Sequence, residues 1–350
     1  METAMLFGAM LVAIAGLGTG TCGWPMRLIR RFQFEQFWFV AMLVGLIVIP
    51  WSVVLVSVPN ALAIYREIPW DWFPGDRLVW TNLLAVAWGA ANVLAGICVL
   101  RIGFTLTGSI LTGVGMTVSV ITPMLLPGLF PKAPGLFSPA GGLILFSVAV
   151  ILVGVVFSTL AGFGRERVLK SRDEPPPWAS GGFLGGLVLA VVAGVLSAGM
   201  QLANAFGHDA IVDTMKEHGV SLVPSEMSFW AAGLFGGALV NVLYPALLMT
   251  RRKSWAVLGR HWPEMGLSLC FGCQLMLAFA LFGYGRMQMG KFGDSQAPGI
   301  QLAMQIIGGL LVGILAGEWR GVPGKPRTQI AVAFAILIVG AILVTLAQNL

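Results

Sequence analysis

The chain has 350 residues, of which 57% are hydrophobic and only 10% are charged, and its formal net charge is +6. A soluble domain carries roughly 25% charged residues, so this composition excludes an ordinary soluble protein. The basic residues lie in short segments between apolar runs rather than on one patch, which argues against nucleic acid as a partner and predicts the lipid bilayer as the environment.

Apolar stretches of about 20 residues recur along the chain, and a helix of that length crosses the ~30 Å hydrocarbon core of a bilayer. A helix also satisfies its own backbone hydrogen bonds in lipid. Strand-like alternation is absent, so we predict an all-α integral membrane protein with ten transmembrane helices. In chain order, the predicted spans are 4–25, 37–58, 78–100, 104–127, 141–160, 183–206, 227–249, 263–285, 299–317 and 329–348.

Lys and Arg are distributed unevenly over the gaps between these spans. The odd-numbered gaps hold 15 of them and the even-numbered gaps hold 6. The positive-inside rule then places the odd gaps in the cytoplasm and both termini outside. We predict a multi-pass protein of the bacterial inner membrane with periplasmic N- and C-termini.

The segment from Gly162 to Gly182 is highly charged and contains three consecutive prolines. It divides the chain into a first five-helix repeat (1–161), a cytoplasmic linker (162–182) and a second five-helix repeat (183–350). Because five is odd, the second half enters the membrane in the opposite sense, which predicts two inverted five-helix repeats, a common transporter architecture.

Two spans carry small residues at every fourth position, which forms a flat ridge for close helix packing. An accidental pattern in glycine-rich helices is the alternative. The predicted helix-packing residues are Ser109, Gly113 and Thr117 in the fourth span and Gly309, Gly313 and Gly317 in the ninth.

The sixth span places four polar side chains on one helical face. They are Ser197, Gln201, Asn204 and His208. Such a stripe either lines a water-filled cavity or fastens neighbouring helices by hydrogen bonds. Amides both donate and accept hydrogen bonds, so they suit a ligand covered in hydroxyl groups, such as a sugar. Further predicted substrate-binding residues are the amides Asn92, Gln274, Gln301 and Gln305 and the aromatic walls Trp24 and Trp88, although Trp24 also suits an interfacial anchor.

No Asp or Glu lies deep in any predicted span, and Glu226 and Glu264 lie at span starts. If transport is coupled to protons, a titratable group must meet each side of the membrane in turn. The candidates for proton coupling are Asp294, Glu318, His208 and Asp209. A solvated loop charge or a helix cap is the alternative role for each.

The sequence offers no catalytic or cofactor-binding pattern. It has no GxxxxGK[ST] loop for ATP. The group His208, Asp209, Asp213 and His218 matches no metal-ligand spacing. We therefore expect no metal, no cofactor and no enzymatic activity.

Several segments, in order, resemble the bacterial L-rhamnose–proton symporter (RhaT) family over nearly the whole length from Pro25. They are IPWSVVLVSVPN (Ile49–Asn60), WGAANVLAG (Trp88–Gly96), ITPML (Ile121–Leu125), GLVLAVVAGVLSAGM (Gly186–Met200) and GEWRG (Gly317–Gly321). The resemblance implies the drug/metabolite transporter superfamily, ten spans in two inverted repeats, and proton-driven uptake of L-rhamnose or a related deoxy-sugar.

Asn92, Ser197, Asp294 and Glu318 match positions that are shared with the family. The chain departs from the family pattern at TCGWP, at KFGDSQAPG, which lacks flanking tyrosines, and at Gln301, where the pattern suggests a histidine. These departures lie near plausible binding positions, so the substrate is less firmly implied than the fold.

We thus expect a secondary active transporter that imports a small sugar by proton symport with alternating access. Its midplane site would be lined by spans 1, 3, 4, 6, 8 and 9. The alternatives are a carrier for a different metabolite, acting as importer, exporter or facilitator, and a non-transporting membrane sensor.

Overall fold

The computed structural model describes residues 2–68, 77–130, 133–170, 182–290 and 293–347. Every regular element in these ranges is helical, and none of the ranges contains a strand. Within them, nine helices are long and apolar enough to cross a membrane, and a bent helix pair brings the number to ten if it counts as one span. The prediction of an all-α membrane protein is confirmed.

The helices of the first half are α1 (Glu2–Thr21), α2 (Phe34–Met42), the π-helical η2 (Leu43–Val48), α3 (Ile49–Ser57), α4 (Ala61–Glu67), α5 (Arg77–Ile102), α6 (Phe104–Leu125) and α7 (Pro139–Lys170). Those of the second half are α8 (Phe183–Glu217), α9 (Leu222–Ser228), the π-helical η3 (Phe229–Gly233), α10 (Phe235–Arg252), α11 (Trp262–Gln288), α12 (Gly293–Leu315) and α13 (Lys325–Ala347). Two short 3-10 turns, η1 (Trp24–Arg27) and η4 (Trp255–Arg260), follow α1 and α10.

Each predicted span overlaps one of these helices or helix pairs, but two helices run further than expected. Helix α7 continues to Lys170, so residues 162–170 of the predicted linker are helical, and residues 171–181 lie outside the described ranges. Helix α8 has 35 residues. At 1.5 Å per residue it is about 52 Å long, which exceeds the ~30 Å hydrocarbon core.

The contacts divide the chain into two compact units. Unit 1 comprises 1–23, 94–198 and 285–350, and unit 2 comprises 24–93 and 199–284. The chain passes from one unit to the other within α5, α8 and α11. The predicted division into 1–161, 162–182 and 183–350 rests on symmetry between sequence halves rather than on contacts, and it stays a prediction.

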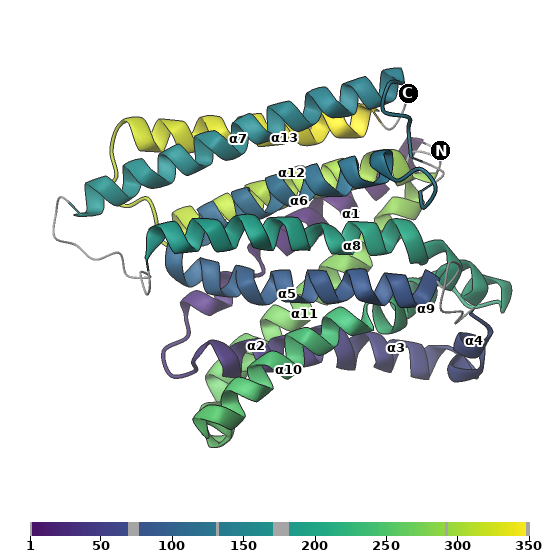
Figure 1. Cartoon of the computed structure of the whole chain (residues 1–350). Coiled ribbons are helices and arrows are strands. Elements are labelled where there is room, and N and C mark those ends of the chain that lie inside the picture. Colours follow the sequence, from purple (N-terminus) through teal and green to yellow (C-terminus); the bar gives the residue numbers. More distant parts are fainter. Residues whose placement is uncertain (1, 69–76, 131–132, 171–181, 291–292, 348–350) are drawn as a thin grey trace. The chain divides into compact units, whose positions relative to one another are not determined.

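In unit 1, α7 and α13 lie side by side and run antiparallel (Figure 1). Their contact is reciprocal. A Cβ atom at Gly154 of α7 would lie 2.8 Å from Leu337 Cγ, and a Cβ atom at Gly340 of α13 would collide with Ile151. Each helix therefore places an aliphatic side chain over the glycine of the other helix.

The same two helices match in sequence. Residues 148–161 read VAVILVGVVFSTLA and residues 334–347 read FAILIVGAILVTLA, with Ala, Val, Gly, Thr, Leu and Ala shared at corresponding positions. Two corresponding hydroxyls also behave alike, because Thr159 donates to Val155 O at 2.9 Å and Thr345 donates to Ala341 O at 3.0 Å. This helix pair thus has a local two-fold relation in both sequence and contact.

Glycine also brings α1 close to α12 in unit 1. A Cβ atom at Gly16 would collide with the backbone oxygen of Gln301, and one at Gly20 would collide with that of Gln305. Glycines four residues apart let two helices approach until their backbones touch.

In unit 2, the seventh span is broken. The segment formed by α9 and η3 meets α10 at 57°. A break leaves backbone groups without helical partners, which lipid does not tolerate. Asn82 of α5 supplies them: its Nδ2 donates to Ala232 O at 3.0 Å, and its Oδ1 accepts from Gly236 N–H at 2.8 Å. The prediction of a continuous span over 227–249 is therefore corrected to a broken one.

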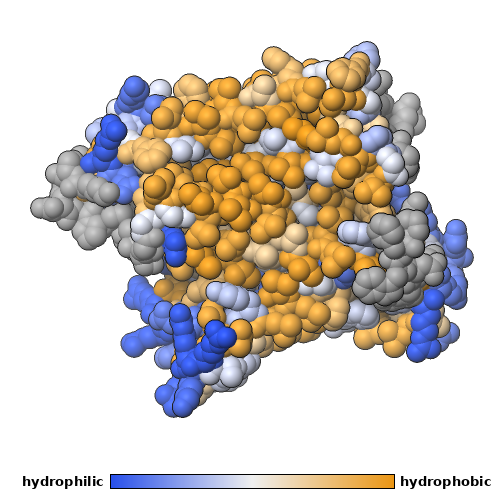
Figure 2. Space-filling model, viewed as in Figure 1, coloured by the Kyte–Doolittle hydropathy of each residue, from blue (hydrophilic) through white to orange (hydrophobic). Residues whose placement is uncertain are grey.

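The outward faces of the helices are apolar. Figure 2 shows hydrophobic side chains along the visible helices and hydrophilic side chains gathered near helix ends. Leu6, Val56, Phe146 and Leu184 are each more than half exposed. Exposed apolar side chains in such number indicate contact with hydrocarbon rather than with water.

The close approach of α7 and α13 generates a first prediction. Replacing Gly154→Val should lower the free energy of unfolding by about 1–3 kcal/mol, because the new methyl groups have no space beside Leu337. Gly142→Val in the same helix should have little effect, because a Cβ atom there would meet nothing within 4 Å. Thermal unfolding of both purified variants in detergent measures the difference, and equal midpoints would contradict the close contact.

Candidate functional site

The predicted substrate-binding residues fall in both units. Ser197, Gln301 and Gln305 belong to unit 1, and Trp24, Trp88, Asn92, Gln201, Asn204 and Gln274 belong to unit 2. Of the six in unit 2, the structure joins Trp24 to Gln274, whose Nε1 and Oε1 atoms form a hydrogen bond of 2.9 Å. This bond ties η1 to the middle of α11 and holds the indole of Trp24 in one orientation.

Trp88 lies in an aromatic cluster of unit 2. It is buried, and its ring meets Trp230 of η3 edge to face at 6.2 Å. Trp230 in turn stacks on Phe279 of α11, with 4.0 Å between the ring centroids. A buried aromatic face of this kind suits the C–H face of a sugar ring as well as a hydrophobic core.

Five of the predicted amides make no side-chain hydrogen bond within the described part of the chain. Asn92 and Asn204 are half-buried and Gln201 is exposed in unit 2, and Gln301 and Gln305 are half-buried in unit 1. An amide carries two donors and one acceptor oxygen, so it costs free energy to leave it unpaired in an apolar surrounding. These side chains are therefore the ones that remain available for a polar ligand.

Other amides in the spans are fully used by the fold. Asn241 accepts a hydrogen bond from Trp38 Nε1 at 3.0 Å and donates to Gly237 O at 2.9 Å. Asn82 bridges the break in the seventh span, as described above. The sequence does not distinguish these structural amides from the available ones, because both types occur as single polar residues in apolar runs.

Ser197 is engaged within α8. Its hydroxyl donates to Gly194 O at 2.7 Å, and Gly115 of α6 lies so close that a Cβ atom there would collide with the Ser197 oxygen. This geometry fits the close packing of α8 on α6 in unit 1. A sugar-binding role for Ser197 stays a prediction.

The small-residue ridges are only partly used for packing. Gly113 lies against Val155, Ile151 and Leu337, and Gly313 lies against Thr105. The hydroxyls of Ser109 and Thr117 bond back to their own helix. Gly309 meets nothing within 4 Å among the described residues, and Gly317 lies beyond the end of α12 with φ +75°. A helix-packing role for these last two glycines stays a prediction.

Glu318 caps a helix in unit 1. It is 1% exposed, and its two carboxylate oxygens accept hydrogen bonds from the backbone N–H groups of Phe104 at 2.6 Å and Thr105 at 3.0 Å. These are the first residues of α6, where a negative charge is favourable. Gly103 precedes them with φ +86°, and a Cβ atom there would lie 2.9 Å from the Glu318 carboxyl carbon.

Arg165 completes this cluster from α7. Its Nη2 donates to Ile102 O at 2.7 Å, at the end of α5, and its Nη1 lies 3.9 Å from a Glu318 oxygen. The guanidinium also lies 5.3 Å from the centre of the Trp319 ring, whose Nε1 donates to Thr105 Oγ1 at 3.2 Å. Anion and cation thus satisfy opposite helix ends at one junction, which is a structural arrangement.

Two of the remaining proton-coupling candidates lie in unit 2. His208 of α8 is 5% exposed, and its two ring nitrogens face two carboxylates: Nε2 lies 3.0 Å from Glu226 Oε2, and Nδ1 lies 3.2 Å from Asp209 Oδ1. Glu226 is itself buried in α9. Asp294 belongs to α12, and its side chain lies outside the described residues.

Glu226 is a residue that sequence reasoning missed. It lies at the start of an apolar span, where a carboxylate is ordinarily a solvated cap. Its pairing with His208 depends on how α9 packs against α8, and the spacing of 18 residues along the chain gives no sign of it.

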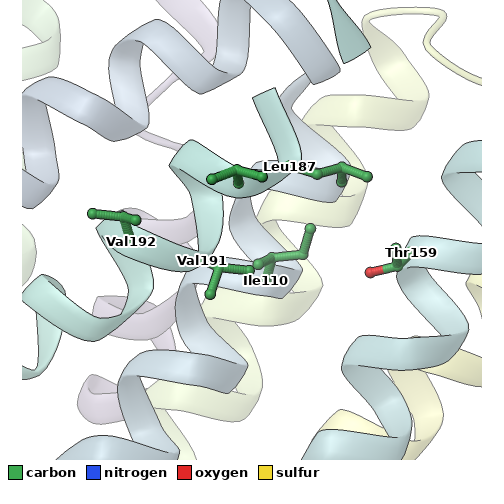
Figure 3. Close-up of a pocket in the computed structure, with 6 residues that line it drawn as sticks. Ile110, Thr159, Leu187, Val191 and Val192 are labelled. Atoms are coloured by element: carbon green, nitrogen blue, oxygen red, sulfur yellow. The ribbon is translucent and has the colours of Figure 1, made fainter. Parts of the chain in front are cut away.

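A pocket of about 280 Å³ lies in unit 1 between α6, α7 and α8 (Figure 3). Its lining residues are Ile110, Thr159, Leu187, Val188, Val191 and Val192. The one polar side chain in it, Thr159, already bonds to its own helix. None of the predicted substrate-binding residues lines it, and its aliphatic wall does not suit a hydroxylated ligand.

The whole chain matches a known family of transporters. Residues 1–349 match the family model described as L-rhamnose-proton symport protein (RhaT). The chain belongs to this family. A relative named L-rhamnose-proton symporter from Cronobacter sakazakii is 26% identical over 357 residues, covering 99% of both chains. Relatives of the same name from Klebsiella pneumoniae and Yersinia pestis are 24% and 23% identical, covering 95% and 100% of this chain and 95% and 98% of their own.

The GEWRG segment, which carries part of the family resemblance, has a structural role. In this family member it supplies Glu318 and Trp319 to the junction between α5 and α6. The segment that carries part of the resemblance is therefore a piece of the scaffold in unit 1. The predicted resemblance to the RhaT family is confirmed.

The Glu318 cap generates a second prediction. Glu318→Gln should lower the free energy of unfolding by about 1–3 kcal/mol, because an amide nitrogen cannot accept the hydrogen bond from α6 that the carboxylate oxygen accepts. Glu217→Gln, at an exposed position of α8, should leave stability unchanged. Thermal unfolding compares the two, and an unchanged midpoint for Glu318→Gln would exclude the capping role.

A third prediction separates structural from available amides. Asn82→Ala should destabilise the protein by about 1–3 kcal/mol, because it leaves the broken span with unpaired backbone groups. Asn204→Ala should leave the unfolding midpoint close to that of the wild type. The reverse order of midpoints would overturn the distinction.

Proposed function

We propose that this chain imports L-rhamnose or a related deoxy-sugar across the bacterial inner membrane together with protons. The observation that carries the proposal is the family match over residues 1–349, because it includes every span that a symporter needs. The relatives that match over nearly their entire length are named L-rhamnose-proton symporters.

The available amides support the sugar as substrate. A pyranose presents several hydroxyls, each of which donates and accepts, and Asn92, Gln201 and Asn204 of unit 2 offer the matching groups without giving up a bond to the protein. Within unit 1, Gln301 and Gln305 of α12 offer groups of the same kind. An analogue that lacks a hydroxyl would leave one of these amides unpaired, which gives the carrier its selectivity. We assign Trp88 and Trp24 as aromatic walls of the same site.

Two inverted five-helix repeats are part of the proposal, as in the drug/metabolite transporter superfamily. The sequence match and reciprocal contact of α7 and α13 support it, since these are the fifth spans of the two halves. The second spans of the halves also correspond, because each contains a π-helical segment, η2 and η3. Inverted repeats give the alternating access that a symporter requires.

The proposed orientation has both termini in the periplasm, from the distribution of Lys and Arg. Protons would then enter from the side where α8 ends and α9 begins. Three of the proposed coupling residues lie toward the periplasmic side in this orientation. They are Asp294, His208 and Asp209. Glu318 lies toward the cytoplasmic side, and its capping geometry favours a structural role.

The fourth prediction is a transport experiment. Proteoliposomes containing the full-length protein should accumulate labelled L-rhamnose under an inward proton gradient, and a protonophore should abolish accumulation. Uptake that ignores the gradient would contradict symport. Competition by unlabelled deoxy-sugars, but not by amino acids, should identify the substrate class, and the absence of any sugar transport would favour a carrier for another metabolite.

The same assay tests the amides. Gln201→Ala and Asn204→Ala should each raise the half-saturating sugar concentration about fivefold, because one lost hydrogen bond costs on the order of 1 kcal/mol. Their unfolding midpoints should match the wild type. Unchanged half-saturation in both variants would remove α8 from the sugar site.

A further inference from the structure

We infer that His208 and Glu226 together form the proton-carrying site of this transporter. The inference rests on the proposed function and adds to it a specific acid–base pair. Both residues lie in unit 2, on different helices, and their side chains meet at 3.0 Å between Nε2 and Oε2.

Both members of this pair are buried. His208 is 5% exposed and Glu226 is 8% exposed. Another pair of the same chemistry, His218 with Glu67 at 3.1 Å, joins the end of α8 to α4, but both of its members are well exposed. A buried pair feels each added or removed proton strongly, because little water screens it, whereas an exposed pair is worth little.

The pair has a route to water. Asp209 contacts the other ring nitrogen of His208, at 3.2 Å, and its side chain is 64% exposed. A proton arriving at Asp209 therefore reaches Glu226 through the two nitrogens of one imidazole. An exposed carboxylate, a buried imidazole and a buried carboxylate in sequence form a short relay from solvent to the interior.

The neighbouring elements contribute few other ionisable groups. Helix α4 brings Tyr65, whose hydroxyl donates to Ser228 O at 3.1 Å and whose pKa burial raises to about 12, so it stays protonated. Helix α11 presents Gly283, where a Cβ atom would lie 3.4 Å from Glu226 Cγ. Element η3 presents Phe229, which meets the His208 ring edge to face at 5.1 Å. Asp209 is thus a further charged group in contact with the pair.

The proton balance of the pair defines its two states. One shared proton suffices for the contact between Nε2 and Oε2. When a second proton is taken up from outside, it neutralises the Glu226 carboxylate, so the charge-assisted contact becomes a weaker hydrogen bond to a neutral carboxyl. Release of that proton to the cytoplasm restores the ionic contact. The cycle moves one proton and leaves no covalent change.

The position of Glu226 connects this switch to the predicted sugar site. Glu226 precedes η3 and the 57° break of the seventh span, so α9 with η3 can move as an arm relative to α10. The arm carries Phe229 against His208 and Trp230 against Trp88. Weakening the contact between Glu226 and His208 would therefore let this arm shift the aromatic wall at Trp88, which links proton uptake to sugar binding.

Proteoliposome assays test the inference with Glu226→Gln and His208→Asn. Both variants should lose gradient-driven accumulation of L-rhamnose while retaining exchange of labelled for unlabelled sugar at equal pH, because exchange needs the sugar site but no net proton transfer. Glu67→Gln and His218→Asn are the matched controls, and they should accumulate sugar as the wild type does. Accumulation by Glu226→Gln at the wild-type level would overturn the inference.

An ion pair that only stabilises the packing of α8 and α9 would give different results in these assays. Its loss would lower exchange and accumulation together and would lower the unfolding midpoint, and that joint loss would count against proton carriage. The swap of His208→Glu with Glu226→His keeps the pair and its volume, so it should recover part of the accumulation lost in the single variants. Failure of the swap protein to fold leaves the single variants and the titration below as the deciding measurements.

A titration without sugar separates this inference from the proposed function. The tryptophan fluorescence of the purified wild type should show a transition between about pH 5 and 8, because protonation of the pair moves Phe229 and Trp230. The transition should vanish in Glu226→Gln, His208→Asn and Trp230→Phe and persist in His218→Asn. Its presence in Glu226→Gln would refute the proton site. A wild type that shows it without transporting L-rhamnose would refute only the proposed substrate.

Discussion

The structure depends on one constraint: a backbone N–H or C=O group in hydrocarbon must find a partner inside the protein. Continuous helices meet the constraint by themselves, so the polar side chains gather where helices end or break. Glu318 and Arg165 serve the junction of α5 and α6, and Asn82 serves the break before α10. Glu264 does the same for the backbone N–H groups of Arg30, Arg31 and Phe32. Each is placed where the backbone would otherwise be unpaired.

Because many polar side chains pair with backbone groups, the polar side chains without such a role are candidates for function. Once the amides that repair or fasten the helices are set aside, those left over, such as Asn92, Gln201 and Asn204, have no structural bond among the described residues. The same sorting separates the carboxylates. Glu318 is held by two backbone donors and a guanidinium, whereas Glu226 faces the imidazole of His208.

The sequence was sufficient for the features that composition controls. Length and hydropathy located a helix or helix pair for every predicted span, because a membrane helix is defined by those two quantities, but they missed how far α7 and α8 continue. It was insufficient for features that need tertiary contact. The prolines of the broken span, Pro224 and Pro245, lie at least ten residues from the break at Leu234, so the π-helical turn and Asn82 from another helix are what reveal it. Gly309 and Gly313 look alike in sequence, yet among the described residues a Cβ atom at Gly313 would collide with Thr105 and one at Gly309 would meet nothing within 4 Å. Likewise, the pairing of His208 with Glu226 is a product of helix packing.

The reciprocal contact of α7 and α13 has a consequence for how such a protein can arise. Because each helix offers the same ridge and the same notch, the contact requires no second kind of surface, and a helix of this sequence can bind an antiparallel copy of itself. A shorter ancestral chain inserted in both directions could have paired through it before the two copies were fused. Under the proposed inverted repeats, fusion would then free each copy to diverge elsewhere, while the residues at the contact between the copies would still have to complement each other.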